Sequence, residues 1–373
     1  MKLAFGPPAS LYPYFGYRSA GQLVLTARAL RPRTGDFKAG GGKWRAIRTM
    51  LGQFATREVM ELAVTLEVAG PDGTVHRHQS VTDREGFVRF DIALDPPLPL
   101  PQRTAWENVH LSWTNRAGPQ MLDAPVLAPG LGERLAVVSD IDDTVIETGI
   151  TGGLASVREN WDRVFTEMPG ERLMVPGADG FYSALSGGPA PVSVGSTVPA
   201  EHRPFFYVSS SPWNLYAYLV AFLSERKLPL GPLLLRDWGL NRATFGSGTH
   251  GAHKIGAIND LLAFYPDLSF ALIGDDSQGD LTAYAEVVRA CPGRVAAVFI
   301  RKVGAAMSAE ELAAKDTIRV AGVPLWLGDD WQTGQAFLAE AGLASNGATA
   351  QIVRTVERLG DTDGDDTTAR AAG

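Results

Sequence analysis

The stretch LAVVSDIDDTVIETG, residues 135–149, constrains the fold of this 373-residue chain more than any other. It begins with four apolar residues, Leu135 to Val138, that show no polar alternation. Such a run is typical of a parallel β-strand that is covered on both faces. Three carboxylates, Asp140, Asp142 and Asp143, follow as the run ends. Because ligands of open α/β sheets bind at the carboxyl ends of strands, these acids fall where a functional site is expected.

Crowded carboxylates repel one another unless another charge compensates them. A bound hard cation such as Mg²⁺ would do so, because it takes oxygen ligands. The alternative for this stretch alone is an Asp-rich turn that caps the next helix with the help of Thr144. The rest of the chain decides between a metal site and a turn.

Composition sets the class of protein. Hydrophobic residues make up 45% of the chain and charged residues 20%, and the length allows two domains with their own cores. The net charge of -7 argues against an extended nucleic-acid-binding surface. The single Cys291 allows no internal disulfide, which indicates a reducing compartment. We see neither a signal-peptide core nor an apolar membrane span, so we expect a cytoplasmic protein without a transmembrane segment.

Residues 1–125 are expected to form an all-β sandwich. Five segments alternate between apolar and polar residues and are separated by turn signals such as GPDG and TDREG. They are GQLVLTARAL, ELAVTLEVAG, TVHRHQSVT, GFVRFDIAL and WENVHLSWT. The side chains that should share one face of GFVRFDIAL are Val88, Phe90, Ile92 and Leu94. Phe87 and two charged residues should face the other way.

A basic loop leading into a short amphipathic helix is expected within KAGGGKWRAIRTMLGQFATREVM, residues 38–60. Its basic residues around Trp44 are Lys38, Lys43, Arg45 and Arg48. The glycines suggest a phosphate loop, but a Walker loop needs a hydroxyl residue after its lysine, and Trp44 stands there. Two interpretations stay open: a solvated basic face, or a surface that holds the protein on an anionic partner or membrane.

A second domain is expected over residues 126–345, after a Pro/Gly-rich linker, Asp123–Arg134. Apolar strands alternate there with helical stretches, which predicts a doubly wound, Rossmann-like parallel sheet. Residues 149–203 should form a modest, mobile insertion near the site rather than a folded domain. We expect residues 346–373 to form a C-terminal helix and a disordered acidic tail.

Reactive side chains follow the strands of this domain in the order acid, hydroxyl, cation, acid. They are Asp140 and Asp142, then Ser209, Ser210 and Ser211, then Lys254, then Asp275, Asp276 and Asp280. Each alone has a simpler explanation, since Ser209 would cap the next helix and Lys254 would be an ordinary surface lysine. Their joint occurrence at successive strand ends favours one site.

This series resembles the motifs of the haloacid dehalogenase superfamily of phosphotransferases. DIDDT resembles its D-x-D-x-T motif, YVSSS the apolar run that ends in Ser or Thr, Lys254 the motif lysine, and GDDSQGD the acidic motif. More closely, residues 126–303 resemble the actin-patch-associated phosphatidate phosphatase family and its bacterial relatives. Asp276 and Ser277 stand where that pattern has Ser-Gly, so a metal-binding role for Asp276 is left open.

The resemblance implies a magnesium-dependent phosphomonoester hydrolase that acts through an aspartyl-phosphate. Asp140 would be the nucleophile and Asp142 the general acid and base, while Ser209 and Lys254 would stabilise the phosphoryl oxygens. The residues implied in phosphate binding are Thr144, Ser209, Ser210 and Lys254. Those implied around Mg²⁺ are Asp140, Asp142 through its carbonyl, Asp275 and Asp280. Asp143 would only shape the turn.

The implied substrate is a phosphatidate-like lipid phosphate, bound with peripheral membrane association and without nucleic acid. A soluble phosphomonoester is the alternative, because PWNLYAYLVAF, residues 212–222, is more typical of a core helix than of an interfacial one. A non-catalytic lipid-binding or protein-binding adaptor is a third interpretation. The intact set of acids argues against it.

Overall fold

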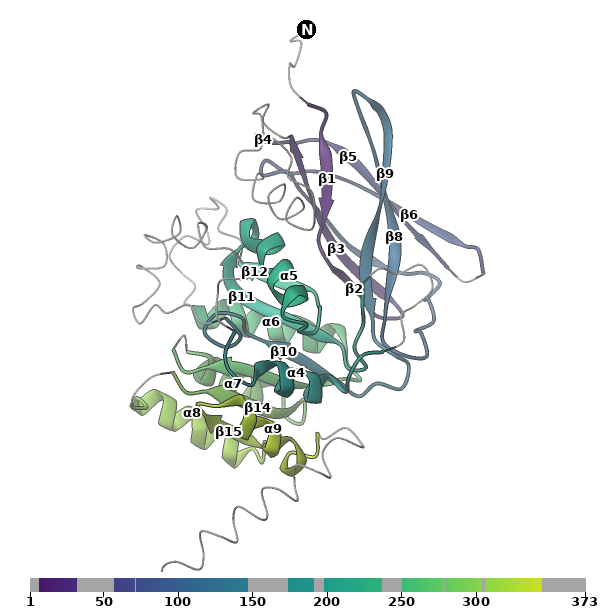
Figure 1. Cartoon of the computed structure of the whole chain (residues 1–373). Helices are drawn as coiled ribbons and strands as arrows, with labels where there is room; N and C mark the ends of the chain where they lie inside the picture. Colours follow the sequence, from purple (N-terminus) through teal and green to yellow (C-terminus); the bar gives the residue numbers. More distant parts are fainter. Residues whose placement is uncertain are drawn as a thin grey trace, which may run out of the picture.

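The structure is a computed structural model that describes residues 7–31, 57–70, 72–146, 174–190, 198–236, 250–277, 279–303 and 306–343. Two β-sheets organise these residues, one of them flanked by helices (Figure 1). The predicted basic segment up to residue 56, most of the predicted insertion and the predicted C-terminal helix and tail lie outside them. No helix in the described ranges is long and apolar enough to span a membrane.

The first sheet has nine strands and is mainly antiparallel. The strands are β1 (Ser10–Pro13), β2 (Gly16–Arg18), β3 (Gln22–Arg31), β4 (Arg57–Glu58), β5 (Ala63–Ala69), β6 (Val75–Val81), β7 (Phe87–Ala93), β8 (Ala105–Asn115) and β9 (Gly118–Ala128). All five predicted segments are strands, namely β3 and β5 to β8. Within the described part of residues 1–125 every regular element is a strand, as predicted, and sandwich packing stays a prediction.

Strand β7 has the two faces that the alternation pattern predicts, and both of them contribute to a core. Val88, Phe90 and Leu94 are buried in the core of the first sheet, as predicted, and Ile92 packs against that core. Phe87 faces the other way, as predicted, and there it is only 4% exposed because it packs in the other core. Phe87 belongs to the hydrophobic core that also contains residues of the second sheet. The alternation pattern of one strand does not reveal such a distant neighbour.

Strand β9 extends into the predicted linker. Residues 123–128 of that segment pair with β8, up to the partners Ala105 and Ala128. Ala124 and Val126, which are two positions apart, both point into the core of the first sheet and are fully buried. This burial outweighs the loop signal of the prolines, so the connection between the sheets starts only after Ala128.

The second sheet has six strands, and all of its neighbouring pairs are parallel. Its order is β12 (Leu233–Arg236), β11 (Phe205–Pro212), β10 (Leu135–Ser139), β13 (Ser269–Asp275), β14 (Val295–Arg301) and β15 (Leu325–Gly328). The chain builds outward from β10 on one side and then on the other. The order therefore reverses between β10 and β13, and such a reversal opens a crevice at the carboxyl ends of the strands.

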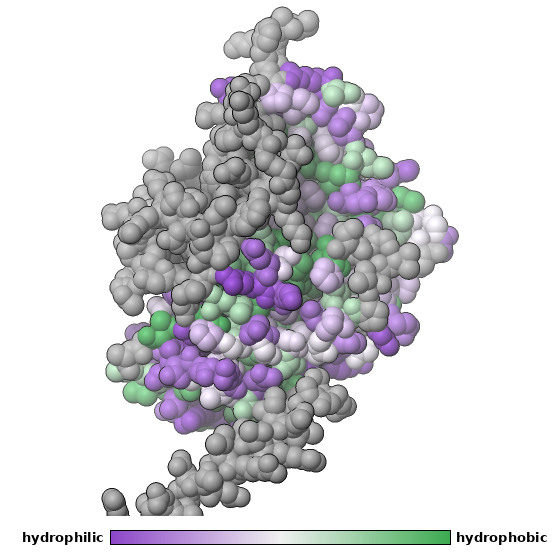
Figure 2. Space-filling view, in the orientation of Figure 1, coloured by the Kyte–Doolittle hydropathy of each residue, from purple (hydrophilic) through white to green (hydrophobic). Residues whose placement is uncertain are grey.

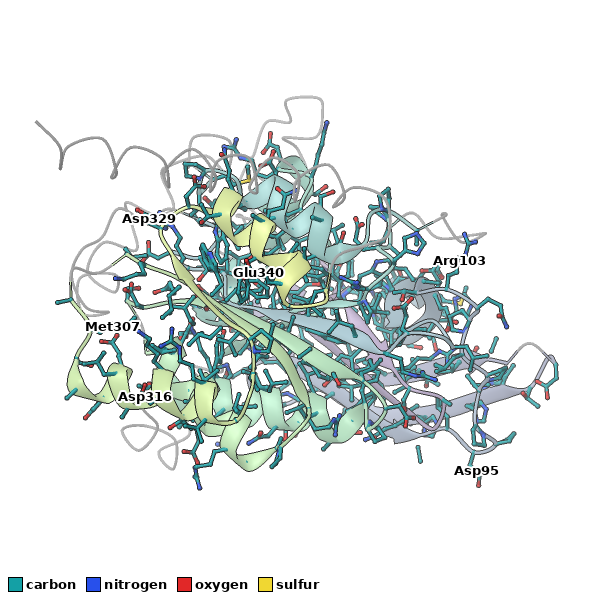
Figure 3. The ribbon with its side chains drawn as sticks, turned by 90° about the horizontal axis from the view of Figure 1, so that it is seen from below. Asp95, Arg103, Met307, Asp316, Asp329 and Glu340 are labelled. Atoms are coloured by element: carbon teal, nitrogen blue, oxygen red, sulfur yellow. The ribbon has the colours of Figure 1, made fainter. Side chains whose placement is uncertain are left out.

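Helices cover both faces of this sheet, as a doubly wound arrangement requires. The helices α4 (Ala178–Ser186), α5 (Tyr216–Glu225) and α9 (Trp331–Glu340) pack on one face, and α6 (His250–Phe264), α7 (Asp280–Ala290) and α8 (Ala309–Val320) on the other. In Figure 3, α9, which carries Glu340, lies across the sheet from α8, which carries Asp316. Hydrophilic residues cover much of the outer surface near α8, with apolar residues scattered among them (Figure 2).

Strand β10 has the double burial that its composition predicts. Val137 faces the core under α4, α5 and α9, while Ala136 and Val138 face the core under α6, α7 and α8. All three are fully buried. Since the faces alternate along a strand, an uninterrupted apolar run is what such a position needs.

Part of the predicted insertion is structured. Helix α4 lies within residues 149–203, where we expected a mobile segment, and it buries Phe181, Tyr182 and Leu185 completely. Phe181 stacks on Trp331 of α9 with ring centroids 4.6 Å apart. The expectation of an unfolded insertion is therefore wrong for this part. Its glycines act at helix ends instead, because Gly177 and Gly187 adopt positive φ angles.

The two sheets meet through aromatic side chains. Tyr14, which follows β1, packs on Trp213 and Tyr216 with ring centroids 4.7 and 4.4 Å away. Phe15 packs on Trp106 at 4.6 Å, and its main-chain N–H donates to the Tyr216 hydroxyl. Segment 212–222 is thus an internal element, as its composition indicated.

Candidate active site

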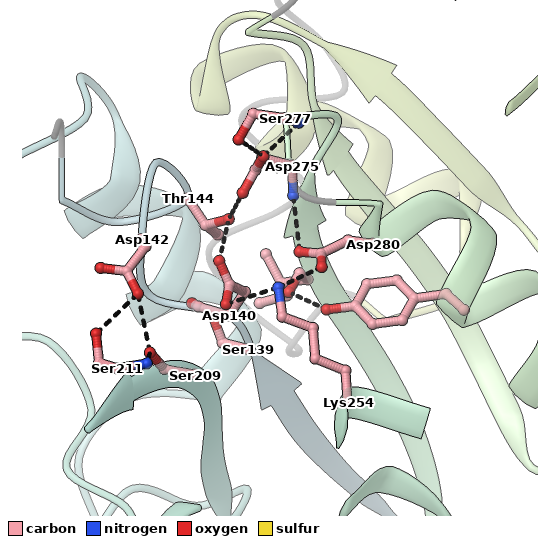
Figure 4. A network of polar contacts seen from close by, with 12 residues as sticks. Ser139, Asp140, Asp142, Thr144, Ser209, Ser211, Lys254, Asp275, Ser277 and Asp280 are labelled. Carbon is pink, nitrogen blue, oxygen red and sulfur yellow. Dashed lines mark hydrogen bonds and ion pairs between the residues drawn. The ribbon is translucent and has the colours of Figure 1, made fainter. Parts of the chain in front are cut away.

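Asp140 follows β10 at the reversal of strand order and is completely buried. Its N–H donates to the Ile273 carbonyl over 2.8 Å, which extends the pairing with β13 by one residue. The Ser139 hydroxyl donates to the Asp140 carbonyl and also contacts the Tyr182 hydroxyl, each over 2.6 Å. These contacts fix the main chain from which the carboxylate projects (Figure 4).

Lys254 lies on α6, which covers one face of the second sheet, and its side chain reaches the Asp140 carboxylate. Its Nζ lies 2.9 Å from Asp140 Oδ1 and also contacts Asp280 Oδ1 at the start of α7. Lys254 is 1% exposed, so it is not the surface lysine of the simpler interpretation. Figure 4 shows its ammonium group between the two carboxylates. Burial disfavours the charged form, but Asp140, Asp280 and Asp275 outweigh it and raise the pKa of Lys254.

Thr144 connects the first and last acidic motifs. Its hydroxyl lies 3.3 Å from Asp140 Oδ2 and 3.1 Å from Asp275 Oδ2. The Trp331 indole N–H donates to the Thr144 carbonyl over 3.0 Å. Thr144 thus lies between the carboxylates of Asp140 and Asp275, and a residue of α9 holds its main chain.

Asp275 ends β13 and is held by its own turn. Ser277 donates to Asp275 Oδ1 through its N–H over 2.6 Å and also through its hydroxyl. The Asp275 N–H in turn donates to Asp280 Oδ2 over 3.2 Å. Burial, followed by repulsion from Asp280, raises the pKa of Asp275 to about 7. Burial likewise raises the pKa of Asp140 well above its usual range, although Lys254 opposes the shift.

Asp142 points to a different set of partners. Its Oδ2 accepts hydrogen bonds from the Ser209 and Ser211 hydroxyls, over 2.9 and 3.0 Å, and it is only half-buried. Burial raises its pKa, while these two hydrogen bonds lower it. Ser209 is therefore not the helix cap of the simpler interpretation. It lies within β11, four residues before the 3₁₀ turn Trp213–Leu215, and Ser210 beside it is buried.

The remaining acids of the two motifs have local roles. Asp143 adopts a left-handed φ of 59°, and its carbonyl accepts a hydrogen bond from Arg301 over 2.7 Å. It shapes the turn, as expected. Asp276 Oδ1 accepts a hydrogen bond from the Val303 N–H over 2.6 Å. Within the described residues it does not belong to the carboxylate group around Asp140.

Three carboxylates meet closely enough to hold a cation. Ligand oxygens of Asp140, Asp275 and Asp280 all lie within 4.8 Å of one another, and all three residues are buried. Lys254 offsets one of the three negative charges. Carboxylate oxygens are the ligands of hard divalent cations, so the donor set and the uncompensated charge both fit such an ion. The side chain of Asp142 is outside this group, which leaves only its main-chain carbonyl for the predicted metal contact.

Several residues that build the site carried no recognised sequence signal. They are Ser139, Tyr182, Arg301 and Trp331. Ser211 was named beside Ser209 without a role, and the structure shows that it donates to Asp142. Tyr182 and Trp331 could not be found from the sequence, because they reach the site from helices far along the chain.

Comparison with known proteins agrees with this geometry. Residues 135–302 match the family model described as "Phosphatidate phosphatase APP1, catalytic domain". This part of the chain is therefore similar to the APP1 catalytic-domain family. The match runs from the first residue of β10 to just beyond β14, so it contains every carboxylate and hydroxyl described above. The resemblance to the phosphatidate phosphatase family is confirmed.

Two curated relatives cover the same region. "Phosphatidate phosphatase APP1" of Saccharomyces cerevisiae is 29% identical over 174 residues, which are 47% of this chain and 27% of that protein. An uncharacterized protein of Schizosaccharomyces pombe is 26% identical over 171 residues, 45% of this chain and 25% of its own. The chain thus spans about a quarter of the length of the curated relatives it matches. Among solved structures, a calcium-binding mutant of Bacteroides uniformis beta-glucuronidase 2 aligns with 88% of this chain and 38% of its own, at a TM-score of 0.24 and 10% identity. That score is too low to support a common fold.

Proposed function

We propose that the chain is a phosphatase of the haloacid dehalogenase type that hydrolyses a phosphatidate-like lipid monoester. The supporting observation is that four residues from three separate segments meet at the carboxyl ends of parallel strands. Asp140 and Asp142 follow β10, Lys254 lies on α6, and Asp275 ends β13. This convergence falls inside the residues that match the phosphatase family.

The proposed reaction has two covalent steps. Asp140 attacks phosphorus, the bond from phosphorus to the alcohol oxygen breaks with its electron pair on that oxygen, and Asp142 gives the oxygen a proton. Water then attacks phosphorus, Asp142 takes the proton of that water, and the bond between phosphorus and Asp140 breaks. Asp140 returns to a carboxylate and inorganic phosphate leaves.

The surrounding residues favour this sequence. The ammonium group of Lys254, next to Asp140, reduces the repulsion between the nucleophile and an anionic phosphate. Ser209 and Ser211 fix the side chain of Asp142, and in this state the Ser209 hydroxyl donates to Asp142 rather than standing free for a phosphoryl oxygen. Asp140, Asp275 and Asp280 would hold Mg²⁺, with the main-chain carbonyl of Asp142. When bound, the ion would supply charge neutralisation between carboxylate and phosphate.

An activity assay tests the proposal directly. The purified chain should hydrolyse phosphatidate in mixed micelles and 4-nitrophenyl phosphate in solution, and a chelator should abolish both activities until Mg²⁺ is returned. Asp140→Asn should lower turnover by about three or more orders of magnitude, because the covalent route closes. Asp276→Asn is the matched control, since that carboxylate contacts a loop N–H. Turnover by Asp140→Asn at the parent rate would contradict the proposed mechanism.

The same assay separates the alternatives. Preference for a water-soluble phosphate over phosphatidate at equal concentration would favour the soluble phosphomonoester. Binding to lipid vesicles without turnover of any phosphate would favour the adaptor. The cytoplasmic location stays a prediction.

Peripheral membrane association is a separate part of the proposal. It rests on the sequence of the basic segment, where each exposed basic residue would contribute about 1 kcal/mol near an anionic surface. Replacing Lys38, Lys43, Arg45 and Arg48 by Ala should weaken cosedimentation with anionic liposomes and leave 4-nitrophenyl phosphate hydrolysis unchanged. Added salt should have the same effect as the substitutions. If the variant sediments as the parent does, the segment is not the membrane contact.

A further inference from the structure

The turn that holds Asp142 is not fixed by its own strand. Strand β11 pairs regularly with β12 up to Ser209 and Leu235, but its next partner pair is Pro212 and Arg236. Two extra residues therefore bulge out of the ladder, and one of them is Ser211. Bulges next to active sites redirect side chains. Here the bulge aims the Ser209 and Ser211 hydroxyls at one carboxylate oxygen of Asp142.

The residues that follow the bulge are held by the first sheet. Trp213, two positions after Ser211, packs on Tyr14 with ring centroids 4.7 Å apart and on Phe87 at 5.9 Å. Asn214 accepts a hydrogen bond from Arg28 over 2.8 Å. The guanidinium carbon of Arg28 in turn lies 4.7 Å from the centre of the Phe87 ring.

These contacts belong to strands β3 and β7, which register Arg28 opposite Phe87. Phe87 is the residue whose burial the alternation pattern of its own strand does not explain. Its partner is the segment after the bulge. Both ends of that segment are thus fixed: the Asp142 carboxylate contacts one end, and the first sheet contacts the other.

We propose that the first sheet positions the general acid. Through Phe87 and its neighbours it clamps Trp213, and the clamp holds the Ser209–Ser211 bulge in the shape that orients Asp142. None of the clamp residues of the first sheet contacts the carboxylate group, so Phe87 is a positioning residue. The catalytic half of this inference rests on the proposed phosphatase function.

Amide hydrogen exchange tests the clamp without any reaction. In Phe87→Ala, amides of residues 209–216 should exchange about tenfold faster than in the parent. Phe90→Ala is the matched control, because Phe90 lies three residues along the same strand and is buried in the core of the first sheet alone. It should lower the melting temperature without faster exchange in residues 209–216. Unchanged exchange in Phe87→Ala overturns the clamp.

A leaving-group series tests the catalytic half. General acid catalysis matters most for poor leaving groups, and kcat/KM reports only the steps up to release of the alcohol. In Phe87→Ala and Trp213→Ala, kcat/KM should fall about tenfold for phenyl phosphate and less than about twofold for 4-nitrophenyl phosphate, since small misplacements of catalytic groups are costly. Trp213→Phe should restore most of the loss.

Each result decides a different point. Equal losses for both esters would assign these contacts to stability alone and overturn the positioning role. If Phe87→Ala fails to fold, Arg28→Ala should show the same pattern with a smaller loss. Absence of turnover in the parent overturns the proposed function and the positioning role with it, whereas the exchange measurement alone decides whether the first sheet holds the turn.

Discussion

Each sheet of this protein buries ionic groups, but the two clusters differ in their balance of charge. In the first sheet, Arg18 is 3% exposed and forms a double contact with Glu107 over 2.6 and 2.7 Å. It also donates to the carbonyls of Leu98 and Pro99. One cation meets one anion there, and backbone oxygens take the remaining N–H groups.

The cluster of the second sheet is not balanced. Lys254 is its cation, and Asp140, Asp275 and Asp280 are its anions. Burying uncompensated charge destabilises a protein, so such a cluster is retained only where protons, a cation or a substrate compensate it. We therefore expect the balanced pair to serve the fold and the unbalanced group to serve the proposed function.

Removing the cation of each cluster should give the largest contrast. Lys254→Met leaves three buried carboxylates without their cation, and breaking a buried ion pair in this way costs about 3–5 kcal/mol. We expect a fall of that size in the free energy of unfolding, measured in urea without metal, and a loss of kcat/KM of about 10³-fold or more. Retention of parent activity and stability would mean that the cluster does not depend on its cation.

The second-largest effect should be a dependence of the free energy of unfolding on pH. The pKa of Asp275 is raised to about 7, so the folded state holds a proton that the unfolded state has lost between about pH 4 and 7. This proton stabilises the fold fully below pH 4, and the stabilisation is lost as the pH rises through 7. Without divalent metal, the free energy of unfolding should fall by about 1–3 kcal/mol from pH 5 to pH 8.

Two controls sharpen that measurement. Asp275→Asn should weaken the pH dependence, because one of the carboxyl groups with a raised pKa is gone. Added Mg²⁺ should stabilise the parent at pH 8 more than this variant, since ligands stabilise the state that binds them. If parent and variant have the same pH profile, the titration of Asp275 does not cause the pH dependence.

The balanced pair should respond more weakly and only in stability. Glu107 is 36% exposed, so Arg18→Met removes an ion pair that water partly screens. We expect a loss of about 1–2 kcal/mol in the free energy of unfolding, mainly from the hydrogen bonds to backbone carbonyls. kcat/KM for 4-nitrophenyl phosphate should stay at the parent value. A selective loss of activity would break the contrast between the two clusters.

An exposed ion pair should give the smallest change in the free energy of unfolding. Arg77 and Glu67 contact each other over 2.6 Å on neighbouring strands, but the Arg77 side chain is 67% exposed. Arg77→Ala should change the free energy of unfolding by less than about 0.5 kcal/mol, because exposed ion pairs contribute little. A larger change in thermal or urea unfolding would show that salt bridges on this sheet matter more than their exposure suggests.

The sequence alone determined whatever is encoded within a few neighbouring residues. The apolar run before Asp140 predicted a strand covered on both faces, and the spacing of Asp140, Asp142 and Thr144 predicted a shared turn. Five of the nine strands of the first sheet, β3 and β5 to β8, followed from alternation in the same way. These features depend on local periodicity, which the chain carries at each position.

Tertiary structure alone decided the contacts between distant segments. Arg18 and Glu107 are 89 positions apart, and Trp331 reaches Thr144 across 187. The burial of Phe87 and the ordering of α4 depend in the same way on partners elsewhere in the chain. A side chain is buried or paired by whatever the fold brings next to it, and periodicity along one strand holds no information about a partner that lies outside that strand.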